Sequence, residues 1–154
     1  MSILVTGGAG YIGSHMVLHL LEKGYEVVIV DDLSTGNMEA VLANKFYKAD
    51  IKDEKAMAKL FDENKIDGII HFAAFSLVGE SMQEPLKYYE NNVTGTLQIL
   101  KYMNDYGIKN IVFSSSAAVY GESSSPIKEN VSANPTIAYG ETKLAVERML
   151  KWAS

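Results

Sequence analysis

Cysteine is absent from this sequence of 154 residues, and proline, histidine and tryptophan are scarce, with three, three and one copies. Without cysteine the chain has neither a disulfide framework nor a thiolate metal site. His15 and His19 lie four residues apart on an expected helix, which is the spacing of a metal-binding pair. Because no third ligand is evident, we expect no metal centre.

Long apolar runs and clusters of basic residues are missing as well. No segment has 18 consecutive apolar residues, and no basic segment precedes an apolar one at the start, so we expect neither a membrane span nor a signal peptide. The net charge is −5 without a lysine or arginine cluster, which argues against a nucleic-acid partner. We expect a cytoplasmic protein, and the lack of cysteine fits a reducing compartment. With 47% hydrophobic residues, the chain can form one ordinary domain with a core.

Glycine gathers near the beginning, between an apolar segment and an expected helix. Gly8, Gly10 and Gly13 fit the pattern G-x-G-x-x-G, and a looser spacing that starts at Gly7 fits as well. Such glycines let backbone amides and the positive end of a helix approach a pyrophosphate, although many glycine-rich turns are only turns. The next apolar segment ends in Asp31, about 20 residues downstream, where dinucleotide-binding units place an acid for the adenosine ribose. Together these features predict a dinucleotide site.

Apolar and helical segments alternate through the remainder of the chain. The segment 67–74 is nearly continuously apolar, which indicates a strand buried on both faces. The alternation predicts an α/β fold with a Rossmann-like, doubly wound parallel sheet. Further strands are expected at 46–50 and 110–114, and helices at 53–63, from Pro85 to Gly107, and from about Ala138. The helix that starts at Pro85 is expected to carry Val93, Leu97, Leu100 and Met103 on one face.

A tyrosine and a lysine on the last expected helix suggest acid–base chemistry. Tyr139 and Lys143 are four residues apart and project from one face, where the lysine charge stabilises a phenolate. The same spacing also arises by chance on many helices. Three serines, Ser114 to Ser116, stand at the carboxyl end of the fifth expected strand, where ligands of such sheets bind. They could simply cap the strand end, or one hydroxyl could relay a proton beside the tyrosine.

Taken together, these motifs resemble those of the extended short-chain dehydrogenase/reductase family, and within it the UDP-glucose 4-epimerases. The resemblance extends over essentially the whole chain. The segments that carry it are 6–13, 31–36, 50–51, 71–74, 78–81, 88–93, 114–116 and 139–143.

The resemblance implies NAD as cofactor and a UDP-hexose as substrate. Tyr139, Lys143 and Ser116 would be catalytic, with Ser116 bridging the sugar 4-hydroxyl and Tyr139. Asp31, with no arginine after it, favours NAD over NADP because a 2′-phosphate would meet its carboxylate. The implied cofactor-binding residues are Gly7, Gly10, Tyr11, Ile12, Gly13, Asp31, Asp32, Ser34, Gly36, Asp50, Ile51, Phe72, Ala73, Ala74, Asn91, Ser114 and Lys143.

The implied reaction is a transient oxidation at C4 to a 4-keto sugar, which turns over and is reduced on its other face. Relatives often have a lysine after the fourth strand where this chain has Ser76. They also continue for about as many residues again. We therefore expect residues 1–154 to be an NAD-binding domain that stops before the last strands and the carboxyl-terminal sugar-nucleotide domain. Alone it is expected to be nearly inactive, and a homodimer is expected from the resemblance.

Two other functions fit parts of the pattern. A sugar-nucleotide 4,6-dehydratase shares the fold, NAD and the tyrosine–lysine pair, but it needs an acid and a base beside the fifth strand. This chain has Ser116, Ala117 and Ala118 there, without a carboxylate. A non-catalytic NAD-binding module or self-associating scaffold is the other alternative, and it rests on the short length of the chain.

Overall fold

The computed structural model describes residues 1–153, and their contacts divide into two compact units. The first, here called the sheet unit, contains residues 1–73 and 98–114. The second, here called the helical unit, contains residues 74–97 and the residues from 115 onward. None of the helices within residues 1–153 is long and apolar enough to cross a membrane.

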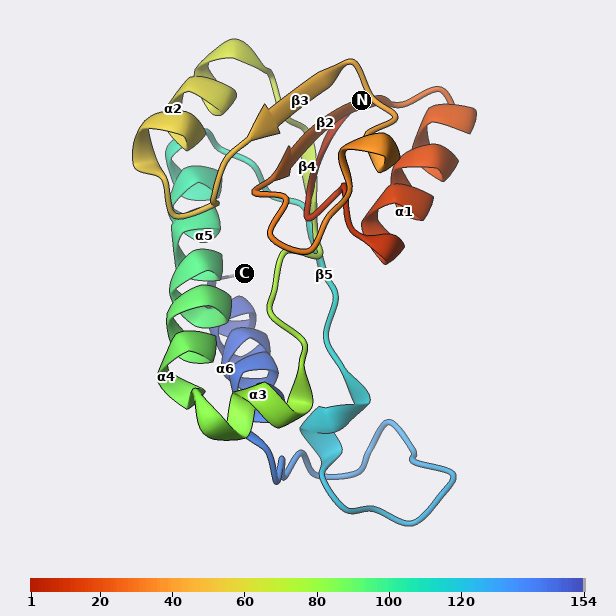
Figure 1. The fold of residues 1–154 in the computed structure, drawn as a ribbon, viewed down its shortest axis with the longest axis vertical. Coiled ribbons are helices and arrows are strands. Elements are labelled where there is room, and N and C mark those ends of the chain that lie inside the picture. The colour runs from red at the N-terminus through yellow and green to blue at the C-terminus, as the bar shows by residue number, and fades with distance from the viewer. Residues whose placement is uncertain (154) are drawn as a thin grey trace. The chain divides into compact units, whose positions relative to one another are not determined.

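The sheet unit is built on five strands in the order β3-β2-β1-β4-β5 (Figure 1). All neighbouring strands are parallel, and the register pairs Ile3 with both Val27 and Gly68. This arrangement confirms the predicted Rossmann-like sheet. The strands are β1 (Ser2–Thr6), β2 (Glu26–Asp31), β3 (Lys45–Lys48), β4 (Gly68–His71) and β5 (Ile111–Phe113).

Alternate strand residues point to opposite faces of the sheet, and helices cover both faces. On one face Leu4, Val28 and Val30 pack with α2 (Glu54–Glu63) and with α5 (Gly95–Asp105). On the other face Val5 and Ile29 pack with α1 (Tyr11–Glu22). Burial on both faces explains why β1 and β2 read as continuous apolar runs.

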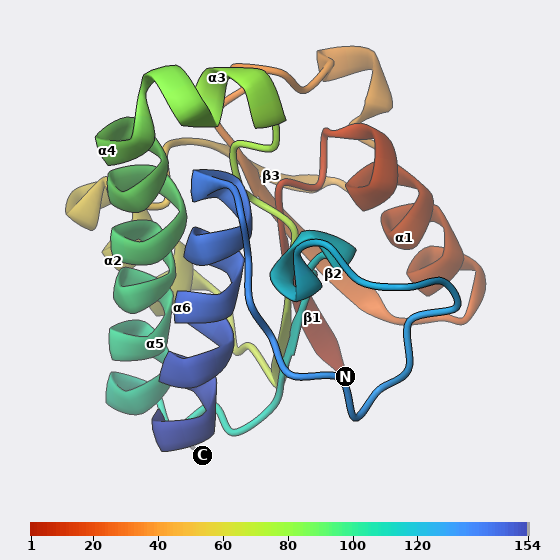
Figure 2. The same cartoon turned by 90° about the horizontal axis from the view of Figure 1, so that it is seen from below.

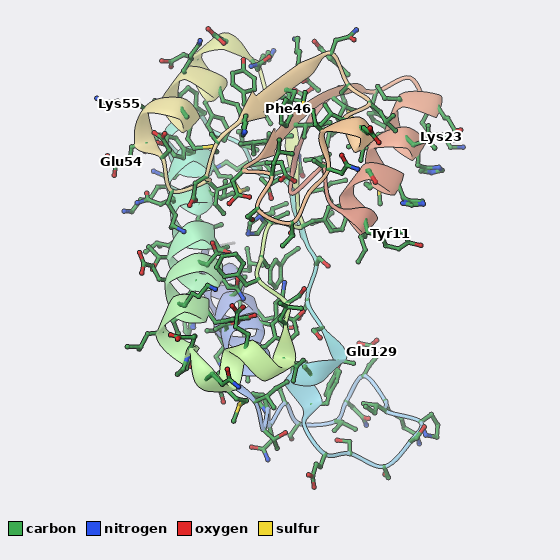
Figure 3. All side chains as sticks on the ribbon, in the orientation of Figure 1. Tyr11, Lys23, Phe46, Glu54, Lys55 and Glu129 are labelled. Atoms are coloured by element: carbon green, nitrogen blue, oxygen red, sulfur yellow. The ribbon has the colours of Figure 1, made fainter. Side chains whose placement is uncertain are left out.

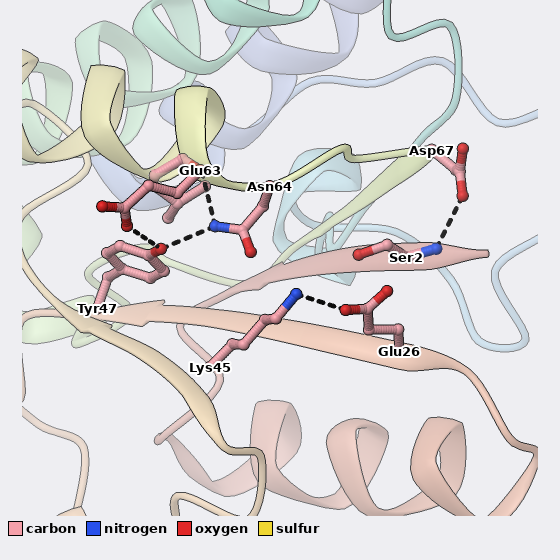
Figure 4. A network of polar contacts seen from close by, with 8 residues as sticks. Ser2, Glu26, Lys45, Tyr47, Glu63, Asn64 and Asp67 are labelled. Carbon is pink, nitrogen blue, oxygen red and sulfur yellow. Dashed lines mark hydrogen bonds and ion pairs between the residues drawn. The ribbon is translucent and has the colours of Figure 1, made fainter.

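Polar contacts lie at the amino ends of the strands, and others join β3 to the end of α2, as Figure 4 shows. Asp67 accepts a hydrogen bond of 2.8 Å from the Ser2 amide, and Lys45 forms an ion pair with Glu26. The Tyr47 hydroxyl donates to Glu63 at 2.7 Å and accepts from the Asn64 side chain at 2.8 Å. The carboxyl ends of the strands form the opposite edge, where ligands of parallel α/β sheets bind.

The helical unit is centred on α6 (Ala138–Ala153), which lies beside α3 (Val78–Gln83), α4 (Pro85–Tyr88) and the π-helix η2 (Tyr89–Thr94) (Figure 2). A 3₁₀ turn, η3 (Ala117–Tyr120), packs on α6 as well. A second such turn, η1 (Met38–Ala40), belongs to the sheet unit. The prediction of a helix from about Ala138 is confirmed.

The single helix predicted from Pro85 to Gly107 is wrong in its interior. Residues 85–105 form α4, the π-helix η2 and α5 in succession, and Leu97 is 43% exposed. The buried side carries Asn92, Thr96 and Ile99 as well as the predicted Met103. Apolar periodicity misplaced this face because Asn92 and Thr96 are polar, and hydrogen bonds are what permit their burial. The predicted strand 67–74 is also shorter, since β4 ends at His71.

Candidate active site

The glycine loop packs too closely against its surroundings for side chains. Gly7 has a φ of 70°, and a Cβ there would lie 2.7 Å from the Ala73 nitrogen. A Cβ on Gly13 would collide with the carbonyl oxygen of Gly7. The Gly7 amide donates to the Val30 carbonyl at 2.9 Å, which fastens the loop to β2. The loop is therefore held in a tight turn at the carboxyl edge of the sheet.

The amino end of α1 presents backbone donors, and no acidic side chain belongs to its own first turn. Gly10 is the N-cap residue and offers no side-chain acceptor, and the first turn contains no acidic residue. The first amides of a helix lack intrahelical partners and carry positive partial charge. Tyr11 and Ile12 are 83% and 60% exposed on this turn, where Figure 3 labels Tyr11. Such an end can bind a phosphate group.

Asp31 joins the glycine loop to the loop that follows β2. It is only 8% exposed, and each carboxylate oxygen accepts one backbone hydrogen bond, from the amides of Ala9 and Leu33, both at 2.9 Å. Leu33 adopts a φ of 62°, which is unusual for a bulky residue. A carboxylate accepts about four hydrogen bonds, so this one retains capacity for ribose hydroxyls. Its negative charge would repel a 2′-phosphate.

The other predicted cofactor residues of the sheet unit lie at or just beyond the ends of its strands. Asp32 accepts hydrogen bonds from the Ser34 amide and hydroxyl at 2.8 and 2.6 Å. Asp50 pairs with Lys52 at 3.1 Å. Gly36, Ile51, Phe72, Ala73 and Ser114 follow β2, β3, β4 and β5 in the same way, whereas Ala74 and Asn91 belong to the helical unit.

Tyr139 and Lys143 lie one turn apart on α6, as predicted. The Lys143 ammonium is 5.8 Å from the centre of the Tyr139 ring. Lys143 is only 3% exposed, and this burial lowers its pKa to about 8 by disfavouring the charged form. The pair therefore places an amine with a shifted pKa beside a phenol, as acid–base chemistry requires.

The segment with Ser115 and Ser116 contacts α6 as well. Ser116 is the N-cap of η3, and its hydroxyl accepts from the Ala118 amide at 3.2 Å. The neighbouring Ser115 hydroxyl donates to the Glu147 carboxylate, one turn beyond Lys143 on α6. This cap belongs to η3 and not to the end of β5, so it differs from the strand-end capping considered from the sequence. Because the hydroxyl oxygen acts as the acceptor, the hydroxyl can still donate its proton.

Sequence patterns did not identify Asn92, Ser81 and Glu147 as parts of this arrangement. The Asn92 side chain accepts from the Phe75 amide at 2.8 Å and donates to the Thr142 hydroxyl at 3.1 Å. It lies in η2, and π-helical turns are frequent at functional sites. Ser81 lies in the segment 78–81 and Asn92 in the segment 88–93, both of which carry the family resemblance. That resemblance was the only signal for these two residues.

A parallel sheet with a glycine loop before α1 and an acid at the end of β2 defines a dinucleotide-binding protein of the Rossmann class. On α6 the same chain carries a tyrosine with a buried lysine one turn away. The chain belongs to the NAD dependent epimerase/dehydratase family, which matches residues 3–154.

Individual relatives agree with this family. The chain is 54% identical to the UDP-glucose 4-epimerase of Lacticaseibacillus casei over 99% of its own length and 47% of that protein. It superposes on a crystal structure of a UDP-glucose 4-epimerase with a TM-score of 0.96 and 49% identity, covering 99% of this chain and 47% of the other. A crystal structure of the UDP-glucose 4-epimerase from Stenotrophomonas maltophila, with bound NAD and formylated UDP-arabinopyranose, superposes with a TM-score of 0.92 and 44% sequence identity. That match covers 98% of this chain and 48% of the other. The chain spans about half the length of the curated relatives it matches.

Proposed function

We propose that this chain is the NAD-binding and proton-transferring part of a UDP-hexose 4-epimerase. The observation that carries the proposal is the buried Lys143 beside Tyr139 on α6. The relatives support the reaction, because proteins 54% and 49% identical to the chain are UDP-glucose 4-epimerases. A dehydratase is not favoured, since the segment from Ser116 to Ala118 has no carboxylate for an elimination.

The donor set of the sheet unit fits NAD. Amides in the first turn of α1 would hold the pyrophosphate, and Asp31 would hold the adenosine ribose, with Tyr11 and Ile12 over the phosphates. Bound NAD would supply a hydride acceptor, and later a hydride donor, for C4 of the sugar. The remaining predicted contacts are Gly7, Gly10, Gly13, Asp32, Ser34, Gly36, Asp50, Ile51, Phe72, Ala73, Ala74, Asn91, Ser114 and Lys143.

Tyr139 performs the proton transfer in this proposal. Its phenolate takes the proton of the sugar 4-hydroxyl as the carbinol is oxidised, and it returns that proton when the 4-keto sugar is reduced on the other face. Lys143 stabilises the phenolate, and with a pKa of about 8 it is mostly charged at neutral pH. The Ser116 hydroxyl donates to the sugar oxygen and orients it. The sugar is neither oxidised nor reduced overall.

The 154-residue chain alone is proposed to bind NAD but to epimerise little, as a single NAD-binding domain without the sugar-nucleotide domain. The reason is the length of its relatives, which continue for about as many residues again. A homodimer in the cytoplasm is part of the same proposal. A UDP-hexose is its small-molecule partner.

The first test measures NAD in material released from the purified chain by denaturation, using absorbance and mass. In parallel, conversion of UDP-galactose to UDP-glucose is assayed with the chain alone and with the chain joined to the carboxyl-terminal half of the Lacticaseibacillus casei relative. We expect NAD in both proteins and conversion only in the joined one. Tyr139→Phe should lower kcat of the joined protein at least a hundredfold, while Tyr120→Phe should leave it nearly unchanged. A joined protein that holds NAD without converting sugar would indicate a non-catalytic NAD-binding module.

A further inference from the structure

The first turn of α6 begins without a local cap. The helix starts at Ala138, and the carbonyl of Ile137 accepts from the Glu141 amide at 3.1 Å, which makes Ile137 the N-cap residue. Serine, threonine, aspartate or asparagine usually stands there, because a side-chain oxygen accepts from the second or third amide of the helix. Isoleucine has no such oxygen. The amide of Tyr139, the second residue of the helix, therefore needs a partner from elsewhere.

Ser81 of α3 supplies that partner from 58 positions away in the sequence. Its hydroxyl accepts from the Tyr139 amide at 3.2 Å and donates to the carbonyl of Val78 at 2.7 Å. Ser81 is 0% exposed, so water does not compete for this bond. The Ser81 hydroxyl thus donates to a carbonyl of its own helix, α3, and accepts from an amide of α6. It therefore caps a helix to which it does not belong.

The position of α3 is itself fixed by a buried tyrosine. The Tyr88 hydroxyl accepts from the Leu77 amide at 3.0 Å and lies 2.8 Å from both the Leu77 carbonyl and the Glu80 carboxylate. Lys87 forms an ion pair of 2.6 Å with Glu80. Burial, and then Glu80, raise the pKa of Tyr88 to about 12, so its hydroxyl keeps its proton. The start of α3 is consequently anchored, which makes Ser81 a fixed acceptor.

The peptide groups of Tyr139 are held on their other side as well. The Thr142 hydroxyl donates to the Tyr139 carbonyl at 2.7 Å and accepts from the Asn92 side chain at 3.1 Å. Both the amide and the carbonyl of Tyr139 are therefore hydrogen-bonded to side chains. The carbonyl is bonded by Thr142 of the same helix, whereas the acceptor of the amide, Ser81, lies outside α6. Displacements of about 1 Å at a reacting group lower rates by as much as a hundredfold.

We propose that Ser81 is a positioning residue for Tyr139, acting by capping the first turn of α6 from α3. The proposal rests on the proposed function for its effect on turnover, but the hydrogen bond can be tested without any activity. Loss of the Ser81 hydroxyl leaves the Tyr139 amide without an acceptor, and Ile137 has no oxygen to replace it. The first turn then frays, and the phenol loses its fixed position.

Amide hydrogen exchange of the 154-residue chain, measured by NMR, tests the cap directly. We expect Ser81→Ala to accelerate exchange at Tyr139 about tenfold or more, and Ser123→Ala, which removes an exposed hydroxyl bonded to Tyr120, to change nothing. Ile137→Thr installs a local cap. The double variant Ser81→Ala/Ile137→Thr should therefore exchange slowly again. Unchanged exchange in Ser81→Ala would overturn the proposal.

Turnover of the joined protein gives the functional arm. Ser81→Ala should lower kcat about tenfold with KM for UDP-galactose within twofold, and Ile137→Thr should restore kcat. If Ser81→Ala fails to fold, a folded double variant with a protected Tyr139 amide supports the proposal, and an unfolded double variant contradicts it. A joined protein that is inactive even with Ser81 present refutes the proposed function, whereas the exchange result still decides the cap.

Discussion

The burial of Lys143 makes the stability of the folded chain depend on pH. The residue is 3% exposed, and its pKa falls from the ordinary 10.5 to about 8 because burial disfavours the charged form. Below pH 8 the folded protein carries a buried cation at a cost in stability. As the pH rises from about 8 towards 10.5, the unfolded chain holds a proton that the folded chain has lost, so stability increases with pH.

Replacing this lysine should reveal that cost. We expect Lys143→Met to be more stable than the parent at pH 7, by of order 1–3 kcal/mol. The difference should shrink at pH 9.5, because the parent is relieved of its charge there. Urea unfolding at the two pH values measures both differences. The exposed Lys101→Met should show no such dependence, and a Lys143→Met variant less stable than the parent at pH 7 would contradict the prediction.

At the scale of single elements, α2 has the best-defined start. Asp53 is its N-cap, and one carboxylate oxygen accepts from the amides of Lys55 and Ala56 at 3.0 and 3.1 Å. Asp53→Ala should lower the free energy of unfolding by about 1 kcal/mol, whereas Asp53→Asn should cost only a few tenths. Urea unfolding of both variants measures the effect, and equal losses would show that the charge rather than the oxygen matters.

The elements also show where sequence reasoning works. The sheet and α6 were predictable because their signals are local: apolar runs, a glycine loop, and Tyr139 and Lys143 one turn apart. The π-helix η2 was not, because Asn92 and Thr96 are buried through hydrogen bonds, and periodicity registers only apolar side chains. Ser81 escaped for a related reason. Its partner is 58 residues away, and no local pattern connects the two.

For the molecule as a whole, binding of the cofactor should increase the stability of the folded chain. A ligand that binds only the folded chain adds about 2.7 kcal/mol when present at a hundred times its Kd. We therefore expect NAD to raise the unfolding temperature of the 154-residue chain progressively with concentration. NADP should need much higher concentrations, because Asp31 would face its 2′-phosphate. Thermal scans with the two nucleotides at matched concentrations decide this, and equal shifts would argue against the role of Asp31.

The place of β1 in the sheet has a consequence for synthesis. β1 is the first strand in the chain yet lies between β2 and β4. Its β2 partner follows soon, but the pairing of Thr6 with His71 joins residues 65 positions apart. A ribosome that has released only β1, α1, β2 and β3 thus presents a half-made sheet whose open edge is its future centre. Until β4 emerges, the amides and carbonyls on the β4 side of β1 are available to any other extended chain.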